Sequence, residues 1–255
     1  MSDVTPGEAA RAALVALTLG VLPLLPLAGY AWAQGVFDPP RIKLTRLVTG
    51  NDSTALRVAR AIETGDTPGV IEAQTGVAIE DGGSRSGTLA WYLVDAFSQD
   101  SPRAAYFDWK DGCEQACPQL DAMLQHHGIA ERPDPARIIA DEAIHAQNRG
   151  AMPVVWAHYA PIFDAHGLHL LTLDPQPGWD AYYLFVAPRR TARKWSGTVI
   201  EEPGNGGLEI HAIPAPTSDI STAEGLAAAL SEVTAGADAA HPAPLLAGLP
   251  LSDLF

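Results

Sequence analysis

The clearest structural signal in the chain is the stretch LHLLTLDPQPGWDAYYLFVA, residues 168–187. It contains two apolar runs of strand length, Leu168–Leu173 and Ala181–Ala187, separated by the segment Asp174-Pro-Gln-Pro-Gly178. Short apolar runs bounded by Pro and Gly are typical of strands that a turn connects. The stretch therefore predicts two strands joined by a hairpin-like connection.

Helical spacing of apolar residues, N-cap residues and Pro or Gly breaks predict the elements on either side. The predicted helices cover Thr54–Glu63, Pro68–Gln74, Thr88–Ser98, Cys113–His127, Asp134–Asn148 and Thr222–Val233. The segment Val154–Ala165 is ambiguous, although its large apolar residues fit a helical face better than an alternating strand. Two further strands are predicted over Arg103–Trp109 and Leu208–Ile213, and an exposed loop over Glu80–Gly87. Runs of helices and strands without regular alternation indicate the α+β class. We expect a small mixed sheet of about 3–5 strands packed with several helices.

Four segments are predicted along the chain. Residues 1–33 form an apolar leader, 34–87 a helical lead-in and loop, 88–213 the α+β core domain, and 214–255 an acidic Ala/Pro-rich C-terminal segment. The pair Pro39-Pro40 is expected to stop any helix there. From Trp195 onward there are 8 acidic residues and no Lys or Arg.

Composition excludes two classes of protein. The 255 residues are 47% hydrophobic and include 6 Trp, 6 Tyr and 6 Phe, which excludes disorder of the whole chain. The formal net charge is −14, so nucleic acid is not an expected partner, because binding phosphates requires clustered cations.

The N-terminus predicts export. No charged residue occurs in the 26 positions from Ala12 to Phe37, and Ala31-Trp32-Ala33 is a small-x-small cleavage site. Pro23 and Pro26 limit the uninterrupted apolar core to the length of a signal peptide. We expect a periplasmic or secreted protein. The alternatives are a membrane anchor, favoured by the basic residues that follow the run, or a buried helix of a cytoplasmic protein.

The two cysteines, Cys113 and Cys117, lie four residues apart on a predicted helix. Both thiols can therefore face the same way, as a disulfide, as core thiols, or as a redox or soft-metal (copper) pair. The Cys-x3-Cys-Pro spacing is similar to that of Sco-type copper-delivery proteins, which are thioredoxin-like domains with an N-terminal anchor. Those proteins have Pro directly after the first cysteine, where this chain has Glu114. We expect no bound metal and no cofactor.

The remaining clusters of histidine, acidic and basic residues are expected to have structural rather than catalytic roles. Three histidines (His158, His166 and His169) lie within twelve residues but need not converge on a metal, which requires three or four ligands. The carboxylates of Asp108, Asp111 and Glu114 are expected to cap the helix that follows, with acid–base chemistry as the alternative. The basic cluster Arg189–Lys194 is expected to balance the acidic C-terminal segment, with anion or phospholipid binding as the alternative.

A family resemblance covers residues 89–188. The sequences LVDAF (93–97), YFDWKD (106–111), GLHLLTLD (167–174) and WDAYYLFV (179–186) resemble an uncharacterised family of bacterial domains. The family has an Asp-Trp-Lys strand and a Leu-Asp…Asp-x-Tyr hairpin. The resemblance implies a small α+β domain and no assigned activity.

The predicted function is a non-catalytic domain that binds a protein or a small molecule, with membrane contact only through an uncleaved N-terminus. Binding groups gather at strand ends, so the candidate ligand-binding residues are Asp108, Trp109, Asp174, Asp180 and Tyr182. One alternative is a thiol-based metal or redox protein that uses the two cysteines. A second is a hydrolase-type enzyme that uses Asp108 and Asp174 as carboxylates.

Overall fold

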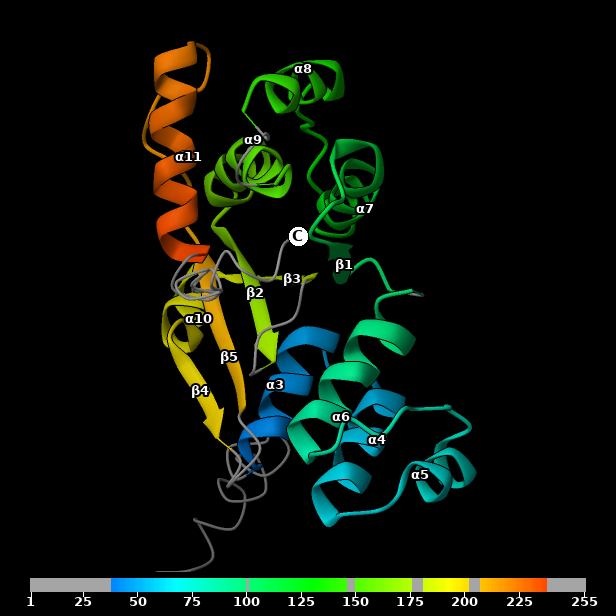
Figure 1. Cartoon of the computed structure of the whole chain (residues 1–255). Helices are drawn as coiled ribbons and strands as arrows, with labels where there is room; N and C mark the ends of the chain where they lie inside the picture. The colour runs from blue at the N-terminus through cyan, green and yellow to red at the C-terminus, as the bar shows by residue number, and fades with distance from the viewer. Residues whose placement is uncertain (1–37, 100, 146–149, 176–180, 202–206, 238–255) are drawn as a thin grey trace, which may run out of the picture.

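The predicted hairpin lies in the middle of a five-stranded sheet (Figure 1). The computed structural model describes residues 38–99, 101–145, 150–175, 181–201 and 207–237. Strands β2 (Leu168–Pro175) and β3 (Ala181–Pro188) pair antiparallel with Leu171 opposite Phe185. The strand order is β1-β3-β2-β5-β4, with β1 (Ala104–Asp108) and β4 (Thr198–Glu201) at the edges and β5 (Gly207–Ile213) beside β2. All four pairings are antiparallel.

Helices cover both faces of this sheet. They are α3 (Pro40–Thr49), α4 (Ser53–Thr64), α5 (Pro68–Thr75), α6 (Arg85–Trp91), the π-helix η1 (Tyr92–Phe97), α7 (Cys113–His126), α8 (Pro135–His145), α9 (Met152–Ala165), α10 (Arg189–Trp195) and α11 (Ala223–Ala237). The predicted α+β class and the predicted strand number are confirmed.

The sheet separates two hydrophobic cores, because successive residues of a strand point to opposite faces. On β3, Leu184 and Val186 belong to the core formed with α7, α9 and α11, whereas Tyr183 and Phe185 belong to the core formed with α3, α4 and α6. Figure 1 shows these two groups of helices on either side of the strands. Residues of the predicted lead-in, among them Leu44, contribute to the second core.

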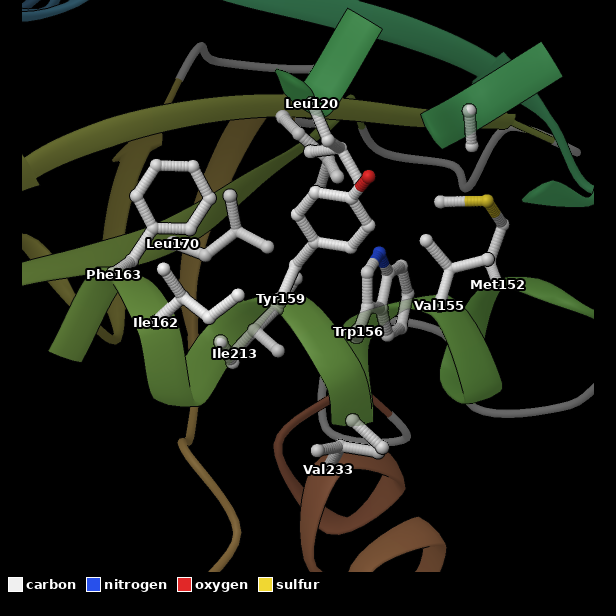
Figure 2. Packing of buried hydrophobic residues seen from close by; sticks show 14 of the residues in the cluster. Leu120, Met152, Val155, Trp156, Tyr159, Ile162, Phe163, Leu170, Ile213 and Val233 are labelled. Atoms are coloured by element: carbon white, nitrogen blue, oxygen red, sulfur yellow. The ribbon is translucent and has the colours of Figure 1, made fainter. Parts of the chain in front are cut away.

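Helix α9 is the centre of the first core (Figure 2). Its side chains Trp156, Tyr159 and Phe163 are fully buried, and 11 of its 14 residues are buried in total. A helix buried on nearly all sides has no polar stripe, which is why the spacing of its apolar residues left the assignment ambiguous. The helical interpretation of this segment is confirmed.

The structure differs from the predicted elements in two places. Helix α3 was not predicted: Pro40 is its first residue, where the missing N–H has no partner to lose. Whether the proline pair ends a helix that precedes it falls on residues outside the described part of the chain. Helix α6 begins at Arg85, inside the predicted loop, because the Ser84 side chain accepts a hydrogen bond from Gly87 N at 2.9 Å.

Basic residues of α3 form ion pairs. Arg41 Nε lies 3.1 Å from Glu63 Oε2 and Arg46 Nε lies 2.7 Å from Asp38 Oδ2. The predicted leader, residues 1–33, lies outside the described residues. Among the helices that are described, none has the length and apolarity needed to cross a membrane.

Candidate functional site

The two carboxylates of the hydrolase hypothesis lie on opposite faces of the sheet. Asp108 ends β1 and pairs with Ala181, on the face of Tyr183 and the second core. Asp174 lies on β2 four residues after Leu170, so both side chains are on the face of the first core. Asp174 is 2% exposed. Strand β3 also separates them, so the two carboxylates do not form an acid–base pair.

The remaining candidate ligand residues are dispersed. The Tyr182 ring packs edge to face on Trp156, with centroids 4.8 Å apart, in the first core. Trp109 follows β1 and is 46% exposed, with Lys110 Nζ 5.1 Å from its ring centroid. Asp180 lies outside the described residues. The four described candidates therefore share one end of the sheet but not one surface.

Asp108 and Asp111 close the turn after β1 instead of capping the helix. Asp111 Oδ2 accepts a hydrogen bond from Asp108 N at 2.8 Å, and Asp111 N donates to Asp108 O at 2.9 Å. Asp108 Oδ1 accepts from Lys110 N at 3.0 Å. Glu114 lies in the first turn of α7, where a negative charge interacts favourably with the helix dipole.

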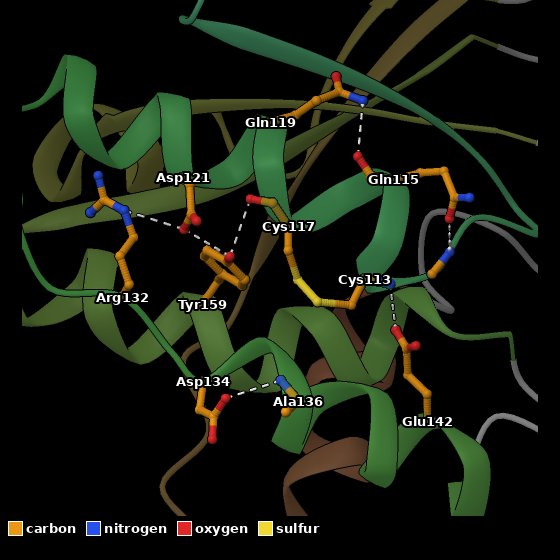
Figure 3. The surroundings of a disulfide bond; sticks show 11 residues. Cys113, Gln115, Cys117, Gln119, Asp121, Arg132, Asp134, Ala136, Glu142 and Tyr159 are labelled. Atoms are coloured by element: carbon orange, nitrogen blue, oxygen red, sulfur yellow. Dashed lines mark hydrogen bonds and ion pairs between the residues drawn. A yellow bond between two sulfur atoms is a disulfide. The ribbon is translucent and has the colours of Figure 1, made fainter.

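The N-terminus of α7 is capped from α8 (Figure 3). Glu142 Oε1 accepts a hydrogen bond from Cys113 N at 2.7 Å, across 29 positions of sequence. Burial raises the pKa of the Glu142 carboxyl, the Cys113 N–H lowers it, and the charge of Glu114 raises it. This contact joins α7 to α8 beside the cysteines.

Cys113 and Cys117 are joined by a disulfide on the first turn of α7, with Cα atoms 4.7 Å apart. Both residues are buried, and Tyr159 Oη donates to Cys117 O at 3.2 Å. Within the described part of the chain, no cluster of three or more His, Cys, Asp or Glu residues could hold a metal ion.

Each of the three histidines contacts a different carboxylate. His158 Nε2 lies 2.9 Å from Asp141 Oδ2, whereas His169 Nε2 lies 2.9 Å from Asp164 Oδ1. Burial lowers the pKa of His158 more than its Asp141 partner raises it. His166 lies 3.9 Å from Glu131. The three rings therefore belong to three different contacts.

Arg189, the first residue of the basic cluster, pairs with α9 rather than with the acidic C-terminal segment. Its Nη2 lies 2.9 Å from Asp164 Oδ1 and donates to Asp164 O at 2.8 Å. This pair ties α10 to the end of α9.

A polar patch that the sequence analysis missed lies on the first-core face of the sheet. Thr172 is opposite His211, and Asp174 is opposite Glu209, on the adjacent strands β2 and β5. Burial lowers the pKa of His211 more than Glu209, 3.4 Å away, raises it. The alternation of polar and apolar residues in 208–213 is the signal that could have indicated this patch.

A groove runs along the open side of β1. It has a volume of about 840 Å³ and is bounded by α6 and η1 on one side and by α7 on the other. The lining residues are Trp91, Val94, Ser98, Gln99, Ser101, Pro102, Ala104, Tyr106, Pro118, Gln119 and Ala122. Trp91 and Tyr106 are each 38% exposed. Two exposed large aromatic side chains in the lining of one groove are unusual on a protein surface.

The edge of β1 in this groove presents backbone groups. No described strand pairs with that side of β1. The N–H and C=O of Asp108 point away from β3, since both bond to Asp111. Because outward and inward residues alternate along an antiparallel strand, the N–H and C=O of Tyr106 and Ala104 also point outward, into the groove.

Comparison with known protein families identifies the family to which the chain belongs. The model of a domain of unknown function, DUF6630, matches residues 42–201. The chain belongs to the DUF6630 family. No curated protein and no solved structure matches it.

The family match separates the two candidate surfaces. All the elements that line the groove, from α6 to α7, lie inside the DUF6630 segment. Glu209 and His211 of the polar patch lie beyond its end at residue 201. The groove is therefore the surface that belongs wholly to the DUF6630 domain, and it becomes the candidate functional site.

Proposed function

We propose that this DUF6630 chain is a non-catalytic binding domain whose ligand occupies the groove along β1. The observation that carries the proposal is the exposure of two large aromatic side chains, Trp91 of α6 and Tyr106 of β1, in the lining of one groove of about 840 Å³. Ligand sites are concave and lined mainly by apolar and aromatic side chains with a few polar groups. The amide side chains of Gln99 and Gln119 are polar groups of this kind.

Two matched variants test the groove. A mixed library of small molecules and short peptides is screened by thermal shift against the full chain and then against Trp91→Ala. Ligands of the groove should raise the melting temperature of the full chain and lose the shift in Trp91→Ala. Trp109→Ala serves as the control, because Trp109 is similarly exposed and lies outside the lining.

The outcomes separate the groove from the end of the sheet. Ligands that are lost in Trp109→Ala and retained in Trp91→Ala would move the site to the turn after β1 and contradict the proposal. A library without any ligand that responds to Trp91→Ala would also contradict it.

We also propose that the chain is exported or tethered by its N-terminal segment. The uncharged stretch Ala12–Phe37 and the Ala31-Trp32-Ala33 site support this, as does the disulfide, since disulfides persist in oxidising compartments. An intact mass of the protein expressed in a bacterial host and alkylated without reduction tests both features. Export predicts loss of residues 1–33 with no alkyl group added, and a tether predicts the full-length mass with no alkyl group added. A full-length mass with two alkyl groups would contradict the export proposal.

A further inference from the structure

We infer that the ligand of the groove is an extended peptide segment that adds to the sheet as a strand beside β1. This inference rests on the proposed function, because it names the occupant of the same groove. The groove combines an open strand edge with walls on both sides, which is what an added strand requires.

The backbone of β1 supplies the recognition. Tyr106 and Ala104 each present one N–H donor and one C=O acceptor on the open side. Asp108, the next outward residue, already bonds to Asp111 through both groups. The edge therefore has a defined end at Asp108, and an added strand would pair with the part of β1 before it.

The walls favour a lone segment over a second copy of the chain. Pro118, Gln119 and Ala122 of α7 lie on one side of β1, and Val94 of η1 and the following Ser98 lie on the other. A second β1 would bring its own α7 and η1 to the same space. A single extended peptide carries no such flanking helices.

The absence of charged residues from the described lining favours an uncharged peptide segment. Among the described residues that line the groove, none is Asp, Glu, Lys or Arg, although the chain carries a net charge of −14. A charged side chain held between these walls would lose hydration without gaining a partner. The carboxylates of Asp108 and Asp111 lie just beyond one end. The fitting partner has uncharged residues in the groove and tolerates a cationic residue at the Asp108 end.

The test begins with a probe peptide. Random twelve-residue peptides displayed on phage are selected on the immobilised full chain, and the Kd of the best synthetic peptide is measured by titration calorimetry. The Kd is then measured for Tyr106→Pro and for Tyr106→Ala. Both variants lose the ring, but only Tyr106→Pro removes the outward N–H, and Pro is tolerated at edge-strand positions whose N–H is not part of the ladder.

Strand addition predicts that Tyr106→Pro binds the peptide about tenfold more weakly than Tyr106→Ala, because one hydrogen bond is lost and a peptide carbonyl is left unsatisfied. Equal Kd values for the two variants would overturn the inference. Where Tyr106→Pro fails to fold, the peptide is instead N-methylated one residue at a time and titrated against the unmodified chain. N-methylation should weaken binding at every second residue of the peptide. A loss of affinity that does not alternate in this way would overturn the inference.

Failure of the inference can be distinguished from failure of the proposed function. Small molecules that require Trp91, together with no selected peptide, leave the groove as the site and exclude strand addition. Peptides whose Kd is unchanged in Trp91→Ala exclude the groove itself. A selected peptide that carries acidic residues at every position would contradict the predicted charge preference.

Discussion

Reduction of the Cys113–Cys117 disulfide is expected to destabilise the protein only modestly. The bridge closes a short loop, with a sequence separation of only 4. In the chain-entropy description, a closed loop of this size restricts the unfolded chain by about 7 cal/mol/K, or about 2 kcal/mol at 25 °C. A change of about 2 kcal/mol corresponds to a fall in melting temperature of about 4–8 °C for a chain of this size.

The assay is thermal unfolding of one preparation with and without a phosphine reductant, with free thiols counted after each scan. The variant Cys113→Ser, Cys117→Ser serves as the control, since reductant should not change its melting temperature. The reasoning is refuted when two free thiols are titrated after reduction and the melting temperature does not move. A fall of more than about 15 °C would refute it as well, because loop closure could not account for it.

Three further predictions concern the scaffold around the groove. Glu142→Ala should lower the free energy of unfolding by about 1 kcal/mol because Cys113 N loses its cap, whereas Glu142→Gln, which keeps an acceptor, should cost less than about 0.5 kcal/mol; urea titration measures both. Phe107→Ala should cost about 3–5 kcal/mol because Phe107 is fully buried, whereas Tyr106→Ala, its half-exposed neighbour on β1, should cost less than about 1 kcal/mol in the same titration. Burial lowers the pKa of His158 and of His211 below 6.5, so the folded chain binds fewer protons than the unfolded chain. Stability should therefore be complete above about pH 6.5 and should fall as the pH decreases from there through the folded-state pKa values; a flat urea midpoint between pH 7 and pH 5 would contradict this.

Elements with a clear periodicity could be predicted from the sequence. The hairpin of β2 and β3 has two apolar runs around a Pro-rich turn, and α7 has its apolar residues on one face. Helix α4 begins where the N-cap residues indicated, since Asp52 Oδ1 accepts a hydrogen bond from Ala55 N at 2.8 Å. These signals are local, so no knowledge of the tertiary structure was needed.

Other elements depend on contacts that the sequence does not display. The edge strand β4 has four residues, which is too short to show a period. The π-helix η1 continues α6 without a break in the apolar pattern, so the change in backbone hydrogen bonding cannot be recognised in the sequence. Helix α3 was not predicted, because Pro40 was considered only as the end of a preceding segment, although Pro also favours the first position of a helix.

The candidate site was hardest to predict, because its residues come from three separate elements. Trp91, Tyr106 and Pro118 were not grouped by any motif, and their association follows from the packing of α6 and α7 beside β1. The cap that Glu142 provides for α7 likewise spans 29 positions. Residues at strand ends were a reasonable expectation, but the alternation of faces placed Asp108 and Asp174 apart.

The most direct measurement of the central claim is residue-resolved amide hydrogen exchange of the full chain, with and without the selected peptide. Binding along the groove should slow exchange of the Tyr106 amide, which points outward from β1. Exchange of the Phe107 amide should be unchanged, because Phe107 faces its partner Tyr182 on β3 in both states. Slowed exchange elsewhere with no change at Tyr106 would contradict the account.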